Sequence, residues 1–204
     1  NRLLAMESRV DSQKIRTGDL NDEQWESIME GSEIIGKSNL IIDDTPGISV
    51  TEMRSKCRKY KMEHDIQLVI VDYIQMMSSG KRVESRQNEV SEISRSLKNL
   101  AREIEAPIVV LSQLNRAVDN RQDHRPQMAD IRESGAIEQD ADVIMFLYRD
   151  DYYKGADEEP TNVTELIVAK HRNGPVGRVN LFFKSEWTKF RDLSKREDGG
   201  SGIR

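Results

Sequence analysis

The order of short apolar runs and one long amphipathic segment constrains the fold of this chain more than any other feature. Residues 67–72 and 108–111 are rich in β-branched side chains and too short for helices, so each run predicts a strand. Between them, apolar residues recur at helical spacing over residues 90–104, and Pro107 marks the end of this predicted helix. The first strand is expected to be buried on both faces, because its apolar run is continuous. This order predicts an α/β fold with parallel central strands.

Further patterns extend this scheme on both sides. They predict helices over residues 21–36 and 49–60 and strands over residues 39–43 and 143–148. Residues 163–170 and 178–184 are two more β-rich runs, and the turn-forming residues 171–177 between them predict a hairpin at the far edge of the sheet. The expected fold is therefore a largely parallel β-sheet flanked by helices, with an edge hairpin near the carboxyl terminus.

Length and composition narrow the class of protein. A chain of 204 residues fits one sizeable core, so we expect a single domain over residues 1–193 and a flexible tail at residues 194–204. No apolar run reaches the roughly 18 residues of a membrane span. The first residues show no secretory signal, and the only cysteine, Cys57, occupies an apolar helix position, so we expect a core thiol in a cytoplasmic protein. The three histidines lack ligand spacing, and no structural zinc is expected.

The candidate chemistry lies where the two central strands end. Asp72 directly follows the first strand, and an apolar strand that delivers a carboxylate at its carboxyl end is the Walker B pattern. Such a carboxylate can bind Mg²⁺ beside nucleotide phosphates, often through retained water. Gln113 follows the second strand, where its amide could sense a phosphate or orient a water molecule. Taken alone, Asp72 could instead be a loop or cap residue, and Gln113 could serve only to tie down its loop.

One apparent phosphate-binding loop is rejected. Residues 31–38 match the pattern of glycine, four residues and Gly-Lys-Ser, which normally follows a strand and opens a helix. Here a predicted helix precedes the segment and a predicted strand follows it, and Glu33 would place a negative charge among the phosphates. We therefore interpret residues 31–38 as the end of a helix.

Six segments together resemble those of bacterial replicative DNA helicases of the DnaB type, in the same order along the chain. They are residues 42–46 (IDDTP), 71–76 (VDYIQM), 93–98 (ISRSLK), 112–116 (SQLNR), 130–142 (DIRESGAIEQDAD) and 170–175 (KHRNGP). The resemblance extends from about residue 2 to residue 193. The joint order of the segments is far more specific than any one of them.

This resemblance implies a RecA-like fold, a ring of six subunits, ATP with Mg²⁺, and movement from 5′ to 3′ along single-stranded DNA that unwinds the duplex at the replication fork. It implies that Asp72 is the Walker B carboxylate and that Gln113 is the polar sensor. Lys170 and Arg172 would reach the nucleotide of the neighbouring subunit. Because glycine and proline fix the turn around Arg172, its side chain is expected to project outward.

The resemblance also places Arg132, Glu133 and Gly135 on a loop that contacts the DNA backbone, and it matches Arg2 to an arginine near the nucleotide. Arginine can hold a phosphate through two hydrogen bonds, and glycine lets backbone N–H groups come close. The net charge of −5 argues only against a wholly basic nucleic-acid binder, because a loop can be locally basic in an acidic protein. Without the resemblance, this loop could be an ordinary helix start with solvated charges.

The sequence departs from the family pattern at its start. In these helicases a phosphate loop and a catalytic glutamate precede the matched segment, and the 204 residues contain neither. We therefore expect the parent protein to be an ATP-dependent helicase and the isolated chain to be inactive as an ATPase. The implied partners are single-stranded DNA, a helicase loader, and primase through a further amino-terminal domain. Two alternatives stay open: a RecA-type recombinase or clock-type ATPase that shares the sheet, and an inactive assembly module.

Overall fold

In the computed structural model of this chain, the structure describes residues 1–80, 84–132, 134–155 and 158–193. The predicted tail at residues 194–204 lies outside the described residues. The described residues form two compact units, of which the first lies within residues 1–42, 147–167 and 178–193 and the second within residues 43–146 and 168–177. The predicted division into one domain and a tail stays a prediction. Within the described ranges, no helix is both long and apolar enough to cross a membrane.

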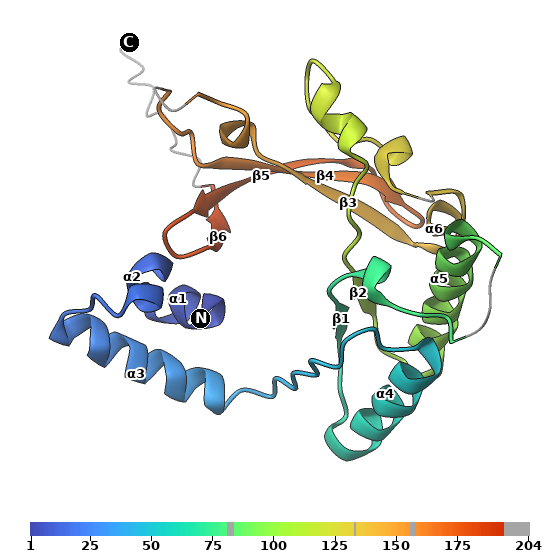
Figure 1. The fold of residues 1–204 in the computed structure, drawn as a ribbon, viewed down its shortest axis with the longest axis horizontal. Coiled ribbons are helices and arrows are strands. Elements are labelled where there is room, and N and C mark those ends of the chain that lie inside the picture. Colours follow the sequence, from blue (N-terminus) through green and yellow to red (C-terminus); the bar gives the residue numbers. More distant parts are fainter. Residues whose placement is uncertain (81–83, 133, 156–157, 194–204) are drawn as a thin grey trace, which may run out of the picture. The chain divides into compact units, whose positions relative to one another are not determined.

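The second unit is built on the predicted strand, helix and strand (Figure 1). β1 (Val69–Val71) and β2 (Ile108–Val110) pair in parallel, and α5 (Arg86–Glu103) connects them. The crossover predicted from residues 90–104 is therefore confirmed. α4 (Val50–His64) precedes β1, and α6 (Ser134–Asp140) follows β2. Short 3₁₀ helices lie in the connections at η1 (Ile74–Met76), η2 (Arg116–Asn120) and η3 (Met128–Asp130).

Local sequence signals set the ends of these helices. Ser49 accepts a hydrogen bond from the backbone N–H of Glu52 at 3.2 Å and so caps α4. Ser85 caps α5 in the same way through the N–H of Asn88, also at 3.2 Å. α5 ends shortly before Pro107, whose ring disfavours helical backbone at the residue preceding it.

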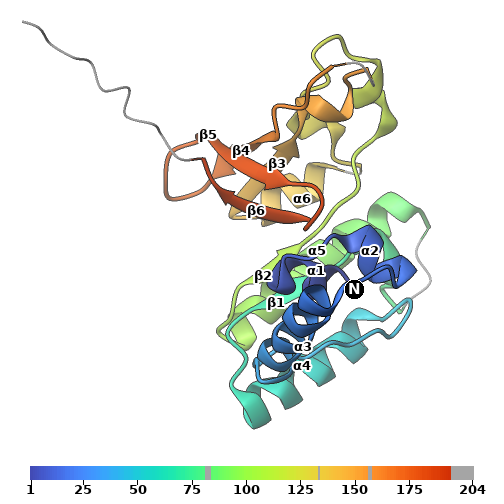
Figure 2. The same cartoon turned by 90° about the vertical axis from the view of Figure 1, so that its left-hand side faces the viewer.

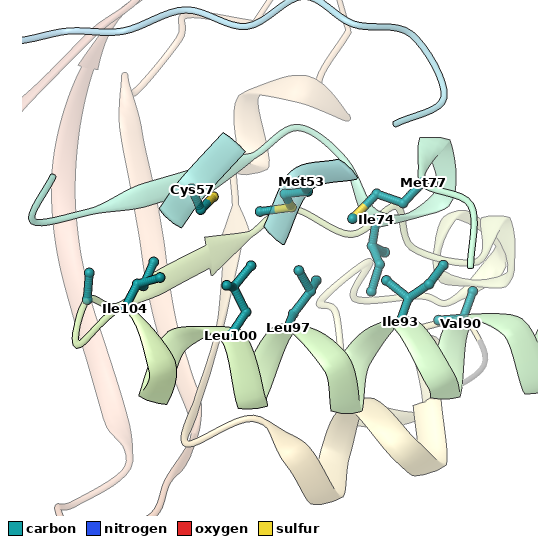
Figure 3. Packing of buried hydrophobic residues seen from close by; sticks show 10 residues of the cluster. Met53, Cys57, Ile74, Met77, Val90, Ile93, Leu97, Leu100 and Ile104 are labelled. Carbon is teal, nitrogen blue, oxygen red and sulfur yellow. The ribbon is translucent and has the colours of Figure 1, made fainter. Parts of the chain in front are cut away.

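The core of the second unit forms along one face of α5 (Figure 3). Val90, Ile93, Leu97 and Leu100 project from this face and are between 0% and 3% exposed. The other buried members of the cluster come from α4, η1 and the chain after α5; they are Met53, Cys57, Ile74, Met77, Ile104 and Ala106. The buried position predicted for Cys57 is confirmed, and burial raises the pKa of its thiol. The amphipathic pattern of the sequence therefore becomes the main packing surface of this unit.

β1 differs from the prediction of a strand buried on both faces. Val69 and Val71 pack against the core cluster, whereas Leu68 is 50% exposed and Ile70 is 63% exposed. The prediction is wrong for the described part of the chain, because alternate residues of a strand point to opposite faces and the helices of this unit cover one of them. A continuous apolar run therefore did not distinguish a covered face from an open one.

The first unit contains three helices from the amino-terminal part of the chain, α1 (Arg2–Ser8), α2 (Ser12–Thr17) and α3 (Asp22–Gly36). Figures 1 and 2 both show α1 lying beside α3. The two helices approach closely at Gly31, where a Cβ atom would lie 3.2 Å from the backbone nitrogen of Ser8. Lys189 Nζ donates to the carbonyl of Met6 at 3.0 Å, which ties α1 to the carboxyl-terminal strands of the same unit.

Four strands form a second sheet in the order β3 (Val143–Tyr148), β4 (Val163–His171), β5 (Gly177–Lys184) and β6 (Lys189–Asp192), and the short helix η4 (Asp150–Tyr152) follows β3. The predicted strand at residues 143–148 and the strands of the predicted hairpin are confirmed. β6 was not predicted; it pairs antiparallel with β5 and takes the outer position that the sequence assigned to the hairpin. Three boundaries between the two units fall within strands of this sheet, in β3, in β4 and after the first residue of β5, and a fourth follows residue 42.

The strand predicted over residues 39–43 is absent. These residues have no regular secondary structure, and Leu40 and Ile42 are 52% and 73% exposed. A strand needs a neighbour to accept and donate its backbone hydrogen bonds, and within the described residues none pairs with this segment. An apolar run of this length is thus not sufficient evidence of a strand.

The packing on α5 gives a first prediction. Leu100→Ala should lower the free energy of unfolding by about 2 to 5 kcal/mol, because it removes a side chain that is 2% exposed and leaves a cavity. The matched control is Met62→Ala on α4, a side chain that is 88% exposed, where the change should stay within about 0.5 kcal/mol. Denaturant titration of both variants measures the difference, and equal losses would contradict the assignment of the core.

Candidate functional site

The parallel pairing of β1 and β2 brings the two sequence candidates to one edge of the sheet. Asp72 directly follows β1, and Gln113 follows β2 by three residues. The pairing continues past the strands, because the N–H of Leu111 donates to the carbonyl of Val71 and the N–H of Ile74 donates to that of Leu111, both at 2.9 Å. Asp72 and Gln113 are both exposed. The structure therefore places a carboxylate and an amide, open to a ligand, at the carboxyl edge.

Gln75 fixes the backbone beneath the predicted sensor, a role that the sequence analysis missed. Its side-chain amide donates to Ser112 Oγ at 3.1 Å and to the carbonyl of Gln113 at 3.4 Å. Its carbonyl oxygen accepts the N–H of Gln113 at 3.3 Å. Gln75 thus pairs with the main chain of Gln113 as a neighbouring strand would. The only sequence signal was its place three residues after Asp72 in the matched segment at residues 71–76.

The carboxylate of Asp72 fits one kind of metal site. Among the described residues, no group of three or more His, Cys, Asp and Glu side chains is close enough to hold a metal ion. Mg²⁺ does not need such a cage, because it commonly keeps several waters and takes one or two carboxylates together with substrate phosphates. The exposed carboxylate of Asp72 fits this donor set, in which most of the oxygens come from water and nucleotide.

The loop after Gln113 is closed by a nearly buried ion pair. Asp130, 4% exposed, accepts two hydrogen bonds from the guanidinium of Arg121 at 2.7 and 2.9 Å and a third from the N–H of Gln127 at 2.7 Å. Arg121 also donates to the carbonyl of Arg125 at 2.6 Å. The Arg121 guanidinium holds the pKa of the Asp130 carboxyl below its usual value. These contacts give the loop between η2 and η3 a defined shape.

The ends of this loop meet beside the predicted DNA-contacting residues. Leu114 and Ile131 form an antiparallel bridge, and the N–H of Asn115 donates to the carbonyl of Asp130 at 2.7 Å. Gln113 and Arg132 are therefore each one residue away from a bridged pair. Arg132 is exposed, and Glu133 lies outside the described residues.

Gly135 is the second residue of α6 and is exposed. A Cβ atom there would meet no other atom within 4 Å, so packing within the chain does not require a glycine at this position. The glycine therefore leaves the start of α6 open to close approach from outside.

Lys170 and Arg172 lie at the end of β4, but the Arg172 side chain does not simply project outward as predicted. It is 45% exposed, and its Nη2 donates to the carbonyl of Gln139 at 2.9 Å. Its Nε lies 3.3 Å from Oδ1 of Asp142. Lys170 Nζ donates to the carbonyl of Glu138. Both cations therefore dock on the last turn of α6, where the unpaired carbonyls of a helix end attract positive charge.

Two other predictions concern the first unit. Arg2 lies on α1 and is exposed, whereas every other predicted nucleotide-binding residue belongs to the second unit. Residues 31–38 form the last turn of α3 and the residues that follow it, with the N–H of Lys37 donating to the carbonyl of Glu33 at 3.0 Å. The interpretation of this segment as a helix end is confirmed, and the expectation that it does not bind phosphate stays a prediction.

Comparison with known proteins gives a consistent result. Residues 1–192 match the family model described as the DnaB-like helicase C-terminal domain. The chain is 50% identical over 198 residues to the replicative DNA helicase DnaC of Bacillus subtilis and 51% identical over 198 residues to the replicative DNA helicase DnaB of Geobacillus stearothermophilus. These alignments cover 97% of this chain and 43% of each relative. The chain thus spans less than half the length of these relatives.

Solved structures agree with this match. A DnaB-like replicative helicase, described together with its interactions with primase, superposes with a TM-score of 0.89 at 43% identity, over 95% of this chain and 47% of that one. A second solved structure, described as an ATPase domain, superposes with a TM-score of 0.88 at 43% identity, over 95% of this chain and 69% of that one. The α/β fold with a parallel sheet, predicted to be RecA-like, is confirmed.

The Arg121–Asp130 pair gives a prediction about pH. Because the folded-state pKa of Asp130 lies below its unfolded value, the pair contributes stability above about pH 4 and loses it as the pH falls through the folded-state pKa. Asp130→Asn should therefore destabilise the protein at pH 7, and the gap to the wild type should narrow on acidification. Denaturant titrations at pH 7 and pH 3 measure this, with the exposed Asp44→Asn as control. A gap that stays constant with pH would contradict the ionic role of Asp130.

Proposed function

The chain belongs to the DnaB-like helicase C-terminal domain family, and from this membership we propose that it is part of the motor of a hexameric replicative DNA helicase. The parent protein would hydrolyse ATP with Mg²⁺, move from 5′ to 3′ on single-stranded DNA and unwind the duplex at the bacterial replication fork. A helicase loader and primase would be its partners in the cytoplasm. The observation that carries the proposal is the match over residues 1–192, which contains all six ordered segments.

The carboxyl edge of β1 and β2 supports the nucleotide part of the proposal. Asp72 would hold Mg²⁺ through water, and the bound metal would neutralise charge on the phosphates. Gln113 would contact the terminal phosphate or the attacking water, since its backbone is held by Gln75 while its side chain stays exposed. Because the backbone of Gln113 is held in place, its side-chain amide stays near one position, where it can orient a phosphate or a water molecule. By the resemblance, Arg2 would also bind nucleotide.

Arg172 and Lys170 would complete the nucleotide site of the neighbouring subunit. Guanidinium suits this task because it is planar, permanently charged and able to hold two phosphate oxygens as charge shifts in the transition state. Arg172 lies directly after β4, in the turn of the β4–β5 hairpin, and nearly half of its side chain is accessible. It is therefore available to a ligand brought by a second copy of the chain in a ring.

The loop that ends at α6 would contact the DNA backbone through Arg132, Glu133 and Gly135. Support comes from the exposure of Arg132 and from the ion pair of Arg121 and Asp130, which fixes the loop that leads to it. A defined loop loses less conformational entropy on binding than a flexible one, so each phosphate contact contributes more to affinity. These contacts would be independent of DNA sequence.

The main test concerns the proposed role of Arg172 as an arginine finger, an arginine that binds the phosphates of the nucleotide in the neighbouring subunit. In the full-length parent, Arg172→Ala should leave ring assembly and ATP binding intact and lower the hydrolysis rate by roughly 10³ to 10⁵, as for arginine fingers in related hydrolases. The control is Arg178→Ala, an exposed arginine of the partner strand β5, which should keep normal turnover. Hydrolysis rates and sedimentation of the rings measure these outcomes.

A mixing experiment tests whether Arg172 acts across the subunit boundary. Subunits carrying Arg172→Ala, mixed with subunits carrying Asp72→Asn, should regain part of the activity. Some interfaces in such rings combine an intact Asp72 from one variant with an intact Arg172 from the other. Full hydrolysis by Arg172→Ala rings alone would eliminate the finger role, and absence of any gain on mixing would show that Arg172 does not act in trans.

The DNA role of Arg132 gives a separate prediction. In the full-length parent, Arg132→Ala should weaken binding to single-stranded DNA of any sequence and reduce the slope of log affinity against log salt by roughly 0.7, the value for one lost phosphate contact. The control is Lys59→Ala, which removes an exposed charge from α4. Fluorescence titrations at several salt concentrations measure both slopes. An unchanged slope for Arg132→Ala would remove this loop from the DNA site.

A further inference from the structure

α6 joins the two proposed functional regions of the second unit. Arg132 lies two residues before α6 begins, and the carbonyls of its last turn accept hydrogen bonds from Lys170 and Arg172. The helix has seven residues, so it spans only about 10 Å at 1.5 Å per residue. Rigid secondary elements can carry coupling between two sites. A displacement of the start of α6 would therefore also move the end that holds the two cations.

Asp142 ties Arg172 to this helix end and to the core. The N–H of Arg172 donates to the carbonyl of Asp142 at 2.8 Å, and its Nε lies 3.3 Å from the Asp142 carboxylate. The second carboxylate oxygen of Asp142 accepts from Lys98 of α5. Lys98 immediately follows the buried Leu97, so the anchor of Asp142 belongs to the helix that organises the core. Both the main chain and the side chain of Arg172 are thereby fixed.

The docked guanidinium keeps donors for a further ligand. Arg172 uses Nε toward Asp142 and Nη2 toward Gln139, and within the described part of the chain its Nη1 donates to no protein atom. Arginine has five N–H donors in a planar fork, so a phosphate oxygen can bind at Nη1 while the other contacts remain. Arg172 can therefore bind a phosphate of the neighbouring nucleotide without leaving its docked position on α6.

We propose that Asp142 is a positioning residue for Arg172. Asp142 is anchored by Lys98 and holds Arg172 on the end of α6. DNA contact near the start of α6 would thereby place the Arg172 guanidinium to bind the nucleotide of the neighbouring subunit. The inference rests on the proposed finger role of Arg172 and the proposed DNA contact of Arg132. Asp142 itself touches neither DNA nor nucleotide. Its effect on hydrolysis passes through Arg172.

The alternative is that Asp142 only stabilises the end of α6. Surface ion pairs usually contribute little to stability, and Asp142 is about half exposed, so its loss would then leave hydrolysis nearly unchanged. A positioning role predicts a different result. Misplacement of a catalytic group by about 1 Å can cost up to about 10²-fold in rate, while substrate affinity is retained.

The test is Asp142→Asn in the full-length parent, a change that keeps the shape of the side chain and removes its charge. The DNA-stimulated kcat for ATP should fall roughly 10- to 100-fold, and the ratio of stimulated to unstimulated hydrolysis should fall with it. The KM for ATP, the affinity for single-stranded DNA and the mass of the ring should not change. The matched control is Glu103→Gln on α5, which removes a carboxylate that pairs with two arginines, Arg54 and Arg58, as Asp142 pairs with Lys98 and Arg172. Glu103→Gln should keep both the DNA-stimulated and the unstimulated rate of ATP hydrolysis.

A second variant, Lys98→Gln, removes the anchor of Asp142 without touching Asp142 or Arg172. It should lower the stimulated rate in the same direction by a smaller factor, and it serves as the test if Asp142→Asn rings fail to form. A normal or raised DNA-stimulated kcat in both variants would overturn the proposal. The double variant Asp142→Asn with Arg172→Ala should hydrolyse ATP at the rate of Arg172→Ala alone, because residues that act through one another are not additive.

These results separate the inference from the function on which it rests. If Arg172→Ala retains full hydrolysis, the finger role itself fails. If Arg172→Ala is nearly inactive while Asp142→Asn keeps its DNA stimulation, the finger stands and the positioning role of Asp142 is overturned. A further loss of rate in the double variant would show that Asp142 acts by another route, and that result also overturns the proposal.

Discussion

The packing of one face of α5 against α4 and the parallel strands is the constraint on which the second unit depends. Val90, Ile93, Leu97 and Leu100 exclude water almost completely, and this burial is the main source of stability available to the unit. The same contact fixes β1 against β2 and so brings Asp72 and Gln113 to one edge. α5 also carries Lys98, whose charge reaches Asp142 beyond the core. The candidate site residues therefore take their positions from the packing of one amphipathic helix.

Carboxylates paired with cations then shape the polar segments that the core does not reach. Asp130 closes the loop before Arg132, and Asp142 holds the turn that carries Arg172. Asp43, in the matched segment at residues 42–46, accepts hydrogen bonds from Thr45 and Lys56, which lower the pKa of its carboxyl to about 2. Because this pKa is lowered, Asp43 stays ionised in acid that would protonate an ordinary aspartate, and its ionic contacts are lost only as the pH falls through this lower pKa. In this structure that segment therefore has a local structural role, which the resemblance alone did not assign.

The proposed function needs residues that are open to ligands but fixed in place, and the structure achieves this through their neighbours. Gln113 and Arg132 are exposed, yet each adjoins a residue of the Leu114–Ile131 bridge. Arg172 is partly exposed, yet its backbone and side chain are both hydrogen-bonded to the end of α6. Contacts of this kind lower the entropic cost of binding, because the loops are ordered before a ligand arrives. The proposed nucleotide sensor and the proposed DNA-contacting loop adjoin one bridge, and the proposed finger is held at the end of α6.

The sequence by itself determined the elements whose signals are local. Periodicity predicted α5 and the strands around it, the Ser49 and Glu52 pattern predicted the start of α4, and the helical pattern before residues 31–38 predicted that this segment ends a helix. Asp72 and Gln113 were found because a parallel strand always delivers its following residue to the same edge. Only the tertiary structure decided which strand faces and which apolar segments are covered by other elements. Ile70 and residues 39–43 are as apolar as neighbouring buried segments, and only the arrangement of other elements leaves them exposed. In the same way, the contacts of Gln75 and Asp142 join residues far apart along the chain, and such pairings follow from the folded geometry because no periodicity in one sequence encodes them.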